Sequence, residues 1–261
     1  MIPLREQELL RQRFLRELTS RVRIDYFTQK PSPFIIPGRQ ECVYCEDVKT
    51  LLEEIASLSE RIALTVHDFS DAAPLAKELG VEMVPGIVVR GQTNRPIRFF
   101  GLPIGSEFPV FIETLVEASR GSVELKPETV KQLRKLRSDV KLQVLVTPTC
   151  PYCPSIALTA ERLALQSVRV KTSVIELSEF LPLAQRYGVR AVPTTLIDDK
   201  VVLPGAMDEA TMVQNILRVA EGKPLAADTK PGPGTAFNPA PPPQGQQPPP
   251  RRVGSSGLIL P

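Results

Sequence analysis

The chain has 261 residues, enough for about two domains of ordinary size, and its formal net charge is only +3, with 32 basic residues interspersed among 29 acidic ones. This balance gives no reason to expect a nucleic acid or an anionic membrane as a partner. Because no apolar run approaches the roughly 18 residues of a membrane-spanning helix, and because the charged N-terminal segment is unlike a signal peptide, we expect a cytoplasmic protein that lies outside any membrane.

The first half of the chain predicts alternating helices and strands. Leu10, Phe14 and Leu18 recur at helical spacing, and the strand-like segment RVRIDYFTQ, residues 21–29, follows them. After a Pro-rich loop at residues 30–40, the sequence CVYC opens a second helix over residues 45–60. The remaining elements are expected in the order strand, short helix, two strands and helix, at residues 62–69, up to Gly80, 86–90, 97–100 and 108–119.

The second half repeats this order of elements. When the sequence is shifted by 108 positions, the two halves superpose Cys42 on Cys150, Cys45 on Cys153, and Val84-Pro85 on Val192-Pro193. A period of this length is too long for a solenoid repeat and indicates a duplicated domain. The second copy predicts a helix, a strand, a helix, a strand, a short helix, two strands and a helix, at residues 130–136, 139–147, 153–166, 170–177, up to Gly188, 194–198, 201–203 and 208–222.

We therefore predict an α/β fold of two tandem domains, each with a mixed β-sheet flanked by helices. The N-terminal domain would span residues 1–121 and the C-terminal domain residues 122–222. Residues 223–261 are dense in Pro, Gly and Gln, and they offer too little apolar surface to offset the entropy lost on ordering. A disordered tail that is dispensable for catalysis is expected there.

The chain has four cysteines, and they form two Cys-x-x-Cys pairs. Two such pairs are the right number for a tetrahedral zinc site, but a duplication places each pair in its own domain, where the two need not converge. Redox chemistry explains the context better, because each pair follows a strand and begins a helix, where free N–H groups stabilise a thiolate. Cys42 and Cys150 would then be the nucleophiles, and Cys45 and Cys153 the resolving thiols.

These motifs resemble those of known disulfide-exchange proteins. CPYC, residues 150–153, is similar to the active-site sequence of glutaredoxins, and the doubled Cys-x-x-Cys domain with FGLPIGSEF at residues 100–108 resembles the protein disulfide oxidoreductases of thermophilic archaea and bacteria. The resemblance covers about residues 4–221. It implies two thioredoxin-like folds, disulfide-bonded proteins as substrates, and an NAD(P)H-dependent flavoprotein of the thioredoxin reductase type as electron partner. No cofactor or metal site is expected in the chain itself.

The resemblance also assigns a role to the repeated Val-Pro dipeptide. Pro85 and Pro193 each lie 43 residues after the first cysteine of their half. Thioredoxin-like folds hold a cis proline beside the Cys-x-x-Cys, and an X-Pro bond can adopt that isomer. Val84 and Val192 would then offer backbone groups to an extended substrate chain.

Two features depart from the family pattern. Thioredoxins hold a buried carboxylate as a proton acceptor in the strand before the cysteines, and the matching positions here are Tyr26 and Val144. Asp25 is adjacent to Tyr26 but should point to the opposite face of the sheet, so the sequence identifies no base for the buried thiol. In the first motif, Val43 replaces the proline of CPYC.

Two other functions stay open at this point. One is a module that holds zinc or an iron–sulfur cluster on its Cys-x-x-Cys pairs. The other is a chaperone or scaffold in which one pair is vestigial and the tail recruits clients. The sequence also leaves open whether net reduction, oxidation or isomerisation occurs, since the redox potential depends on local electrostatics.

Overall fold

The computed structural model describes residues 2–30, 41–226 and 231–237. The first half contains α1 (Leu4–Glu17), β1 (Val22–Thr28), α2 (Cys45–Ser57), β2 (Ile62–Asp68), α3 (Ala73–Leu79), β3 (Gly86–Arg90), β4 (Ile97–Phe100) and α4 (Glu107–Arg120). The second half contains α5 (Pro127–Leu133), β5 (Val140–Val146), α6 (Cys153–Gln166), β6 (Val170–Glu176), α7 (Leu181–Tyr187), β7 (Ala191–Val192), β8 (Thr194–Ile197), β9 (Val201–Pro204) and α8 (Glu209–Ala220). A further strand, β10, is Thr235–Ala236. The predicted order of elements in the repeat is confirmed, whereas most of the Pro-rich loop at residues 30–40 lies outside the described residues.

Both halves contribute to one eight-stranded mixed sheet, with the strand order β2-β1-β3-β4-β6-β5-β8-β9. The predicted α/β class is confirmed, but the two sheets are joined rather than separate. The junction is a parallel pairing of β4 with β6, which places Arg98 opposite Ser173 and Phe100 opposite Ile175. Each of these strands would otherwise be the edge of a four-stranded unit with unpaired backbone groups, and their pairing removes both edges.

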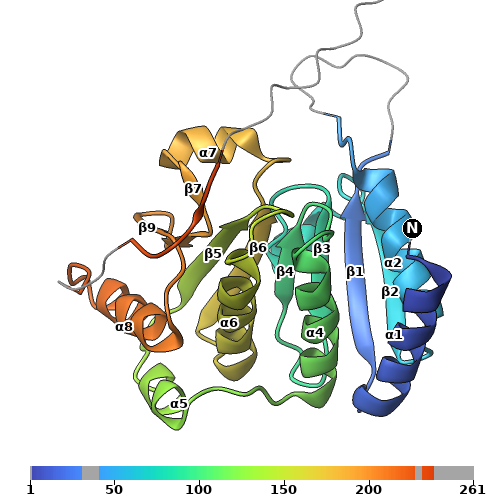
Figure 1. Cartoon of the computed structure of the whole chain (residues 1–261), viewed down its shortest axis with the longest axis horizontal. Helices are drawn as coiled ribbons and strands as arrows, with labels where there is room; N and C mark the ends of the chain where they lie inside the picture. The colour runs from blue at the N-terminus through green and yellow to red at the C-terminus, as the bar shows by residue number, and fades with distance from the viewer. Residues whose placement is uncertain (1, 31–40, 227–230, 238–261) are drawn as a thin grey trace, which may run out of the picture.

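Apolar stripes on the helices explain how they pack on this sheet. In α2, Val48, Leu51, Leu52 and Ile55 are buried, at the spacing of one helical face. Helices α4 and α6 lie on the same side of the sheet, in front of it in Figure 1. The short helices α3 and α7 end at Gly80 and Gly188, whose φ angles of 68° and 61° are in the left-handed region that glycine adopts without strain.

Arg98 adds a polar contact at the junction of the two halves. Its side chain is 7% exposed, and its guanidinium donates to the carbonyl oxygen of Leu79 at 2.5 Å and to that of Thr172 at 3.4 Å. A cation at the C-terminal end of α3 also interacts favourably with the helix dipole. The contact therefore joins the end of α3 in the first half to β6 in the second.

The expectation of a disordered tail is corrected for its described residues. Ala226 is buried, and its N–H donates to Asn215 Oδ1 at 3.3 Å. Farther along, β10 pairs antiparallel with β7. Composition underestimated this order because backbone pairing requires little apolar surface from the segment that pairs. The residues after 237 lie outside the described part of the chain.

Candidate active site

The two Cys-x-x-Cys pairs lie at equivalent places in the two halves. Each follows the C-terminal end of a strand, β1 or β5, and the second cysteine of each pair is the first residue of a helix, α2 or α6. Strands β1 and β5 run in the same direction, because two antiparallel steps, β1 to β3 and β3 to β4, are followed by two parallel ones, β4 to β6 and β6 to β5. Both pairs therefore lie at the same edge of the sheet.

In both pairs the two cysteines form a disulfide. The Cα atoms are 5.5 Å apart in Cys42–Cys45 and also in Cys150–Cys153. Both cysteines of the second pair are 0% exposed, whereas Cys42 is partly exposed and Cys45 is 2% exposed. The first pair is therefore the more accessible of the two in this conformation.

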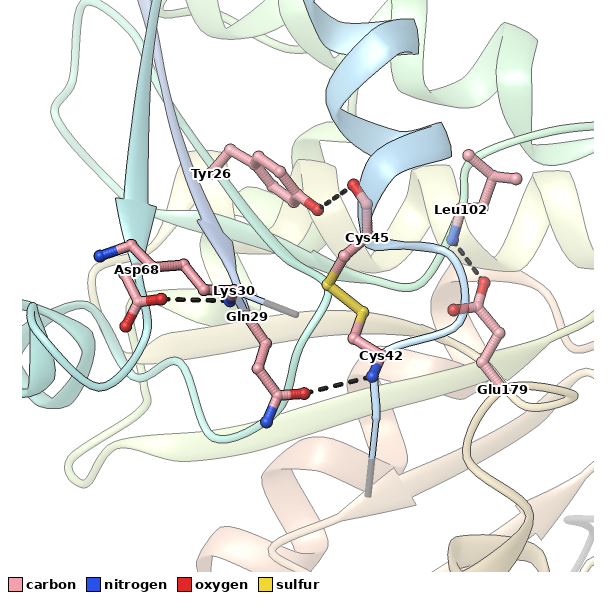
Figure 2. The surroundings of a disulfide bond; sticks show 8 residues. All are labelled: Tyr26, Gln29, Lys30, Cys42, Cys45, Asp68, Leu102 and Glu179. Carbon is pink, nitrogen blue, oxygen red and sulfur yellow. Dashed lines mark hydrogen bonds between the residues drawn. A yellow bond between two sulfur atoms is a disulfide. The ribbon is translucent and has the colours of Figure 1, made fainter. Parts of the chain in front are cut away.

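Different groups support the two pairs. At the first pair, shown in Figure 2, the Tyr26 hydroxyl donates to the carbonyl oxygen of Cys45 at 2.7 Å, and the backbone N–H of Cys42 donates to Gln29 Oε1 at 3.2 Å. At the second pair, the N–H of Cys153 donates to Cys150 Sγ at 3.1 Å. An N–H at a helix start that points at the first sulfur would stabilise a thiolate on that atom.

The cis prolines predicted from the sequence are present. The Val84–Pro85 and Val192–Pro193 peptide bonds are both cis. Each proline carbonyl accepts a hydrogen bond from a glycine at the end of a neighbouring strand, Gly101 to Pro85 at 3.0 Å and Gly205 to Pro193 at 2.7 Å. These contacts fix both loops to the sheet in the same way.

The residues at and beside the proton-acceptor position of thioredoxins differ in their surroundings. Tyr26 is fully buried against Cys45, and Val144 is fully buried. As expected, Asp25 takes the other face, where it binds Arg90 at 2.5 Å and His67 at 3.0 Å. The Asp25 carboxylate therefore pairs with these two side chains on the face of the sheet opposite Tyr26.

Glu107, at the start of α4, supplies a carboxyl that the sequence argument missed. It is 0% exposed, and both of its carboxyl oxygens have no hydrogen-bond partner among the described residues. Its neighbour Ser106 donates through its hydroxyl to the carbonyl oxygen of Cys150 at 3.1 Å and through its N–H to that of Pro148 at 2.9 Å. Glu107 therefore lies beside the second Cys-x-x-Cys loop, although it comes from the first half of the chain.

The protonation of Glu107 follows from this burial. Burial, reinforced by the negative charge of Glu176, raises the pKa of Glu107 to about 8. The signal in the sequence was the acidic residue inside the apolar segment FGLPIGSEF. Only the packing of α4 against the second motif reveals its position.

A second carboxyl group, from the second half of the chain, contacts a residue of the first half. Glu179 follows β6 in the second half, and it accepts a hydrogen bond from the N–H of Leu102 in the first half at 2.7 Å. Figure 2 shows this pair in the surroundings of the Cys42–Cys45 disulfide. Burial is the main cause that raises the pKa of Glu179 to about 7, and Glu176 and Asp47 reinforce it. Each half therefore contributes a carboxyl group with a raised pKa near the motif of the other.

The described residues contain no group of three or more His, Cys, Asp and Glu side chains placed to hold a metal ion. In the same part of the chain, no helix has the length and apolar character needed to cross a membrane. The metal-binding alternative is not favoured, because each Cys-x-x-Cys pair is closed on itself.

Comparison with known proteins agrees with this geometry. Residues 140–218 match the family model of a thioredoxin domain. A protein disulfide oxidoreductase from Aeropyrum pernix superposes with a TM-score of 0.74 over 85% of this chain and 94% of its own, at 23% sequence identity. Both halves of the chain have the thioredoxin fold. The NTD_N/C domain of alkylhydroperoxide reductase from Enterococcus faecalis gives a TM-score of 0.72 over 83% of this chain and all of its own, at 21% identity.

Curated relatives extend the comparison to longer proteins. The F subunit of alkyl hydroperoxide reductase in Xanthomonas campestris is 25% identical over 158 residues, which are 60% of this chain and 28% of that protein. The Escherichia coli protein of the same name is 23% identical over 175 residues, which are 67% of this chain and 32% of that protein. The chain thus spans less than a third of the length of these relatives. At the level of fold, the resemblance to disulfide oxidoreductases is confirmed.

Proposed function

We propose that this protein catalyses thiol–disulfide exchange on disulfide-bonded protein substrates through its two Cys-x-x-Cys pairs. The observation that carries the proposal is the position of each pair, at disulfide distance and at the start of a helix in a thioredoxin fold. In that position the helix N-terminus stabilises a thiolate on the first cysteine. We assign the two thioredoxin-like domains to residues 1–121 and 122–222, and the appended segment to residues 223–261.

The reaction proceeds in two exchange steps. The thiolate of Cys42 or Cys150 attacks one sulfur of the substrate disulfide, which forms a mixed disulfide and releases the other substrate sulfur as a thiolate. Cys45 or Cys153 then loses its proton and attacks the first cysteine, which releases the second substrate thiolate and closes the enzyme disulfide. Two electrons pass to the substrate in each cycle. Val84 and Val192 hold the substrate chain by backbone hydrogen bonds, with Pro85 and Pro193 beside them.

The reduced enzyme must then be regenerated. We propose that an NAD(P)H-dependent flavoprotein of the thioredoxin reductase type supplies the electrons, and that the protein works in the cytoplasm, where paired cysteines are more often catalytic than structural. The names of the relatives, alkyl hydroperoxide reductase and NADH dehydrogenase, support a reductase as partner. Mixing the oxidised protein with such a flavoprotein should oxidise NAD(P)H and expose protein thiols.

Free-thiol counting and metal analysis test the proposal against its alternatives. Purified protein should show no free thiol before reduction and four after it, without bound zinc or iron. A stoichiometric metal that blocks the thiols would instead indicate the metal module. If dithiothreitol reduces a Cys-x-x-Cys disulfide but that pair exchanges with no protein disulfide, the chaperone or scaffold function would be indicated.

We propose Glu107 as the proton acceptor for Cys153, because its buried carboxyl has no hydrogen-bond partner among the described residues and its neighbour Ser106 contacts the carbonyl oxygen of Cys150. Replacing Glu107 by Gln keeps the size of the side chain but removes the base. At pH 7, with only the second pair present (Cys42→Ser and Cys45→Ser), we expect the rate of insulin reduction to fall by about a hundredfold, the lower end of the usual range for general acid–base catalysis. The matched control is Glu128→Gln, at an exposed position in the first turn of α5. An unchanged rate in Glu107→Gln would remove this assignment.

A further inference from the structure

The described part of the tail returns to the second active site. Residues 231–237 run along β7, with Thr235 opposite Val192 and Ala236 opposite Ala191 in an antiparallel ladder. The N–H of Phe237 extends the pairing by donating to the carbonyl oxygen of Arg190 at 2.9 Å. In Figure 1 this red segment lies beside β7. The tail therefore pairs with the residue that directly precedes cis Pro193.

The same segment is held on its other side by the loop after β9. The N–H of Ala206 donates to the carbonyl oxygen of Pro233 at 2.8 Å. A Cβ atom on Gly232 would lie 1.6 Å from the carbonyl oxygen of Ala206, which only glycine avoids. The backbone of Gly232 thus packs directly against the backbone of Ala206, and this contact adds to the pairing with β7. We call residues 231–237 the strap.

The strap makes the two halves of the repeat different. Met83 and Val84 are the counterparts of Ala191 and Val192, and within the described residues no strand pairs with them. Val84 is half-buried, whereas Val192 is 0% exposed. Among the described residues, the same edge is thus unpaired in the first half and paired in the second. The nucleophiles differ in the same direction, because Cys42 is partly exposed and Cys150 is 0% exposed.

We propose that the strap is an internal competitor for the peptide-binding edge of the second site, so that an extended substrate must displace it before Cys150 reacts. The inference rests on the proposed function, which gives Val192 the role of pairing with substrate. The backbone N–H and carbonyl groups of one edge can pair with only one strand at a time. The first site takes substrates directly, and the second takes those that outcompete the strap.

Competition of this kind acts on KM. If the strap occupies the edge for about 90% of the time, the apparent KM for an extended substrate is raised about tenfold, because only the open fraction binds. The rate constants after binding are unaffected, since the strap has left by then. The effect is confined to the second site.

Substitutions in the strap provide the first test, in full-length chains that retain one Cys-x-x-Cys pair. Phe237→Pro removes the N–H that donates to Arg190, Gly232→Val blocks the approach to Ala206, and Phe237→Leu is the matched control that keeps the N–H. With only the second pair present, Phe237→Pro and Gly232→Val should each lower KM for an extended disulfide-bonded peptide by about tenfold at unchanged kcat. With only the first pair present, they should change nothing. Equal KM values in Phe237→Pro and Phe237→Leu, together with an unchanged KM in Gly232→Val, would overturn the proposal.

A binding test separates the strap from the redox function. A synthetic peptide of residues 231–237, PGPGTAF, is titrated into full-length Gly232→Val and into the unsubstituted chain, and the backbone amide signals of Ala191 and Val192 are followed by NMR. We expect the signals to shift only in Gly232→Val, whose edge is free. Shifts in both proteins, or in neither, would contradict the strap. If the peptide binds as expected but no disulfide is exchanged at either site, the proposed function fails and the internal pairing stands.

Discussion

The double variant Cys42→Ser/Cys150→Ser should reduce insulin no faster than dithiothreitol, the electron donor of the assay, does without the protein. Each substitution removes the sulfur that attacks the substrate, and a serine hydroxyl at neutral pH does not replace a thiolate. A chain with one intact pair should retain activity, so the double variant must lose far more than either single one. Turbidity of reduced insulin, followed over time, provides the measurement.

Two controls show whether the loss is chemical. Tyr44 and Tyr152 lie inside the same two motifs, and each side chain is 41% exposed. The variants Tyr44→Phe and Tyr152→Phe should therefore keep nearly full activity. Cys45→Ser and Cys153→Ser should instead accumulate mixed disulfides, because the resolving thiol is gone. Full activity in Cys42→Ser/Cys150→Ser would show that these sulfurs are not the nucleophiles.

The stability of the protein should fall as the pH rises from 5 to 9. Burial raises the pKa of Glu107 and of Glu161 to about 8 each and that of Glu179 to about 7, and it raises the pKa of Glu176 as well. The folded state therefore keeps protons that the unfolded chain releases above about pH 4.5. Stability from these groups is present at low pH and is lost as pH passes through the folded pKa values.

The expected loss in the free energy of unfolding is about 2 to 5 kcal/mol over this pH range, because relaxation of the folded state lowers the contribution of each group. Urea unfolding at several pH values measures it. Glu161→Gln should flatten the profile, because its amide oxygen can still accept from the Thr114 hydroxyl without needing a proton. Glu6→Gln, at an exposed position in the first turn of α1, should leave the slope unchanged. A profile that rises toward pH 9 would contradict the assignment.

Local patterns in the sequence predicted the repeated elements well. Helical spacing, branched strands and helix-ending glycines such as Gly80 and Gly188 depend on neighbours within a few residues, and the structure has these elements in the predicted order. The 108-residue repeat also located both Cys-x-x-Cys pairs and both cis prolines. Each of these features occurs twice, so a chance match was a poor explanation.

Contacts between the halves depended on the tertiary structure. The pairing of β4 with β6, the position of Glu107 beside the second motif, and that of Glu179 near the first all join residues far apart in the chain. A duplicated sequence predicts the same surroundings for both copies. It does not predict which residues of one copy contact the active site of the other.

By itself the sequence determined the duplicated α/β organisation and the four cysteines, because helical periodicity, strand composition and motif spacing are properties of short segments. Only the tertiary structure decided that the halves share one sheet and that the second site differs from the first. Pairing of strand edges is set by which backbone groups remain free after each half has folded, and any segment with free N–H and carbonyl groups can satisfy them. For that reason a Pro- and Gly-rich tail becomes ordered at Thr235 and Ala236.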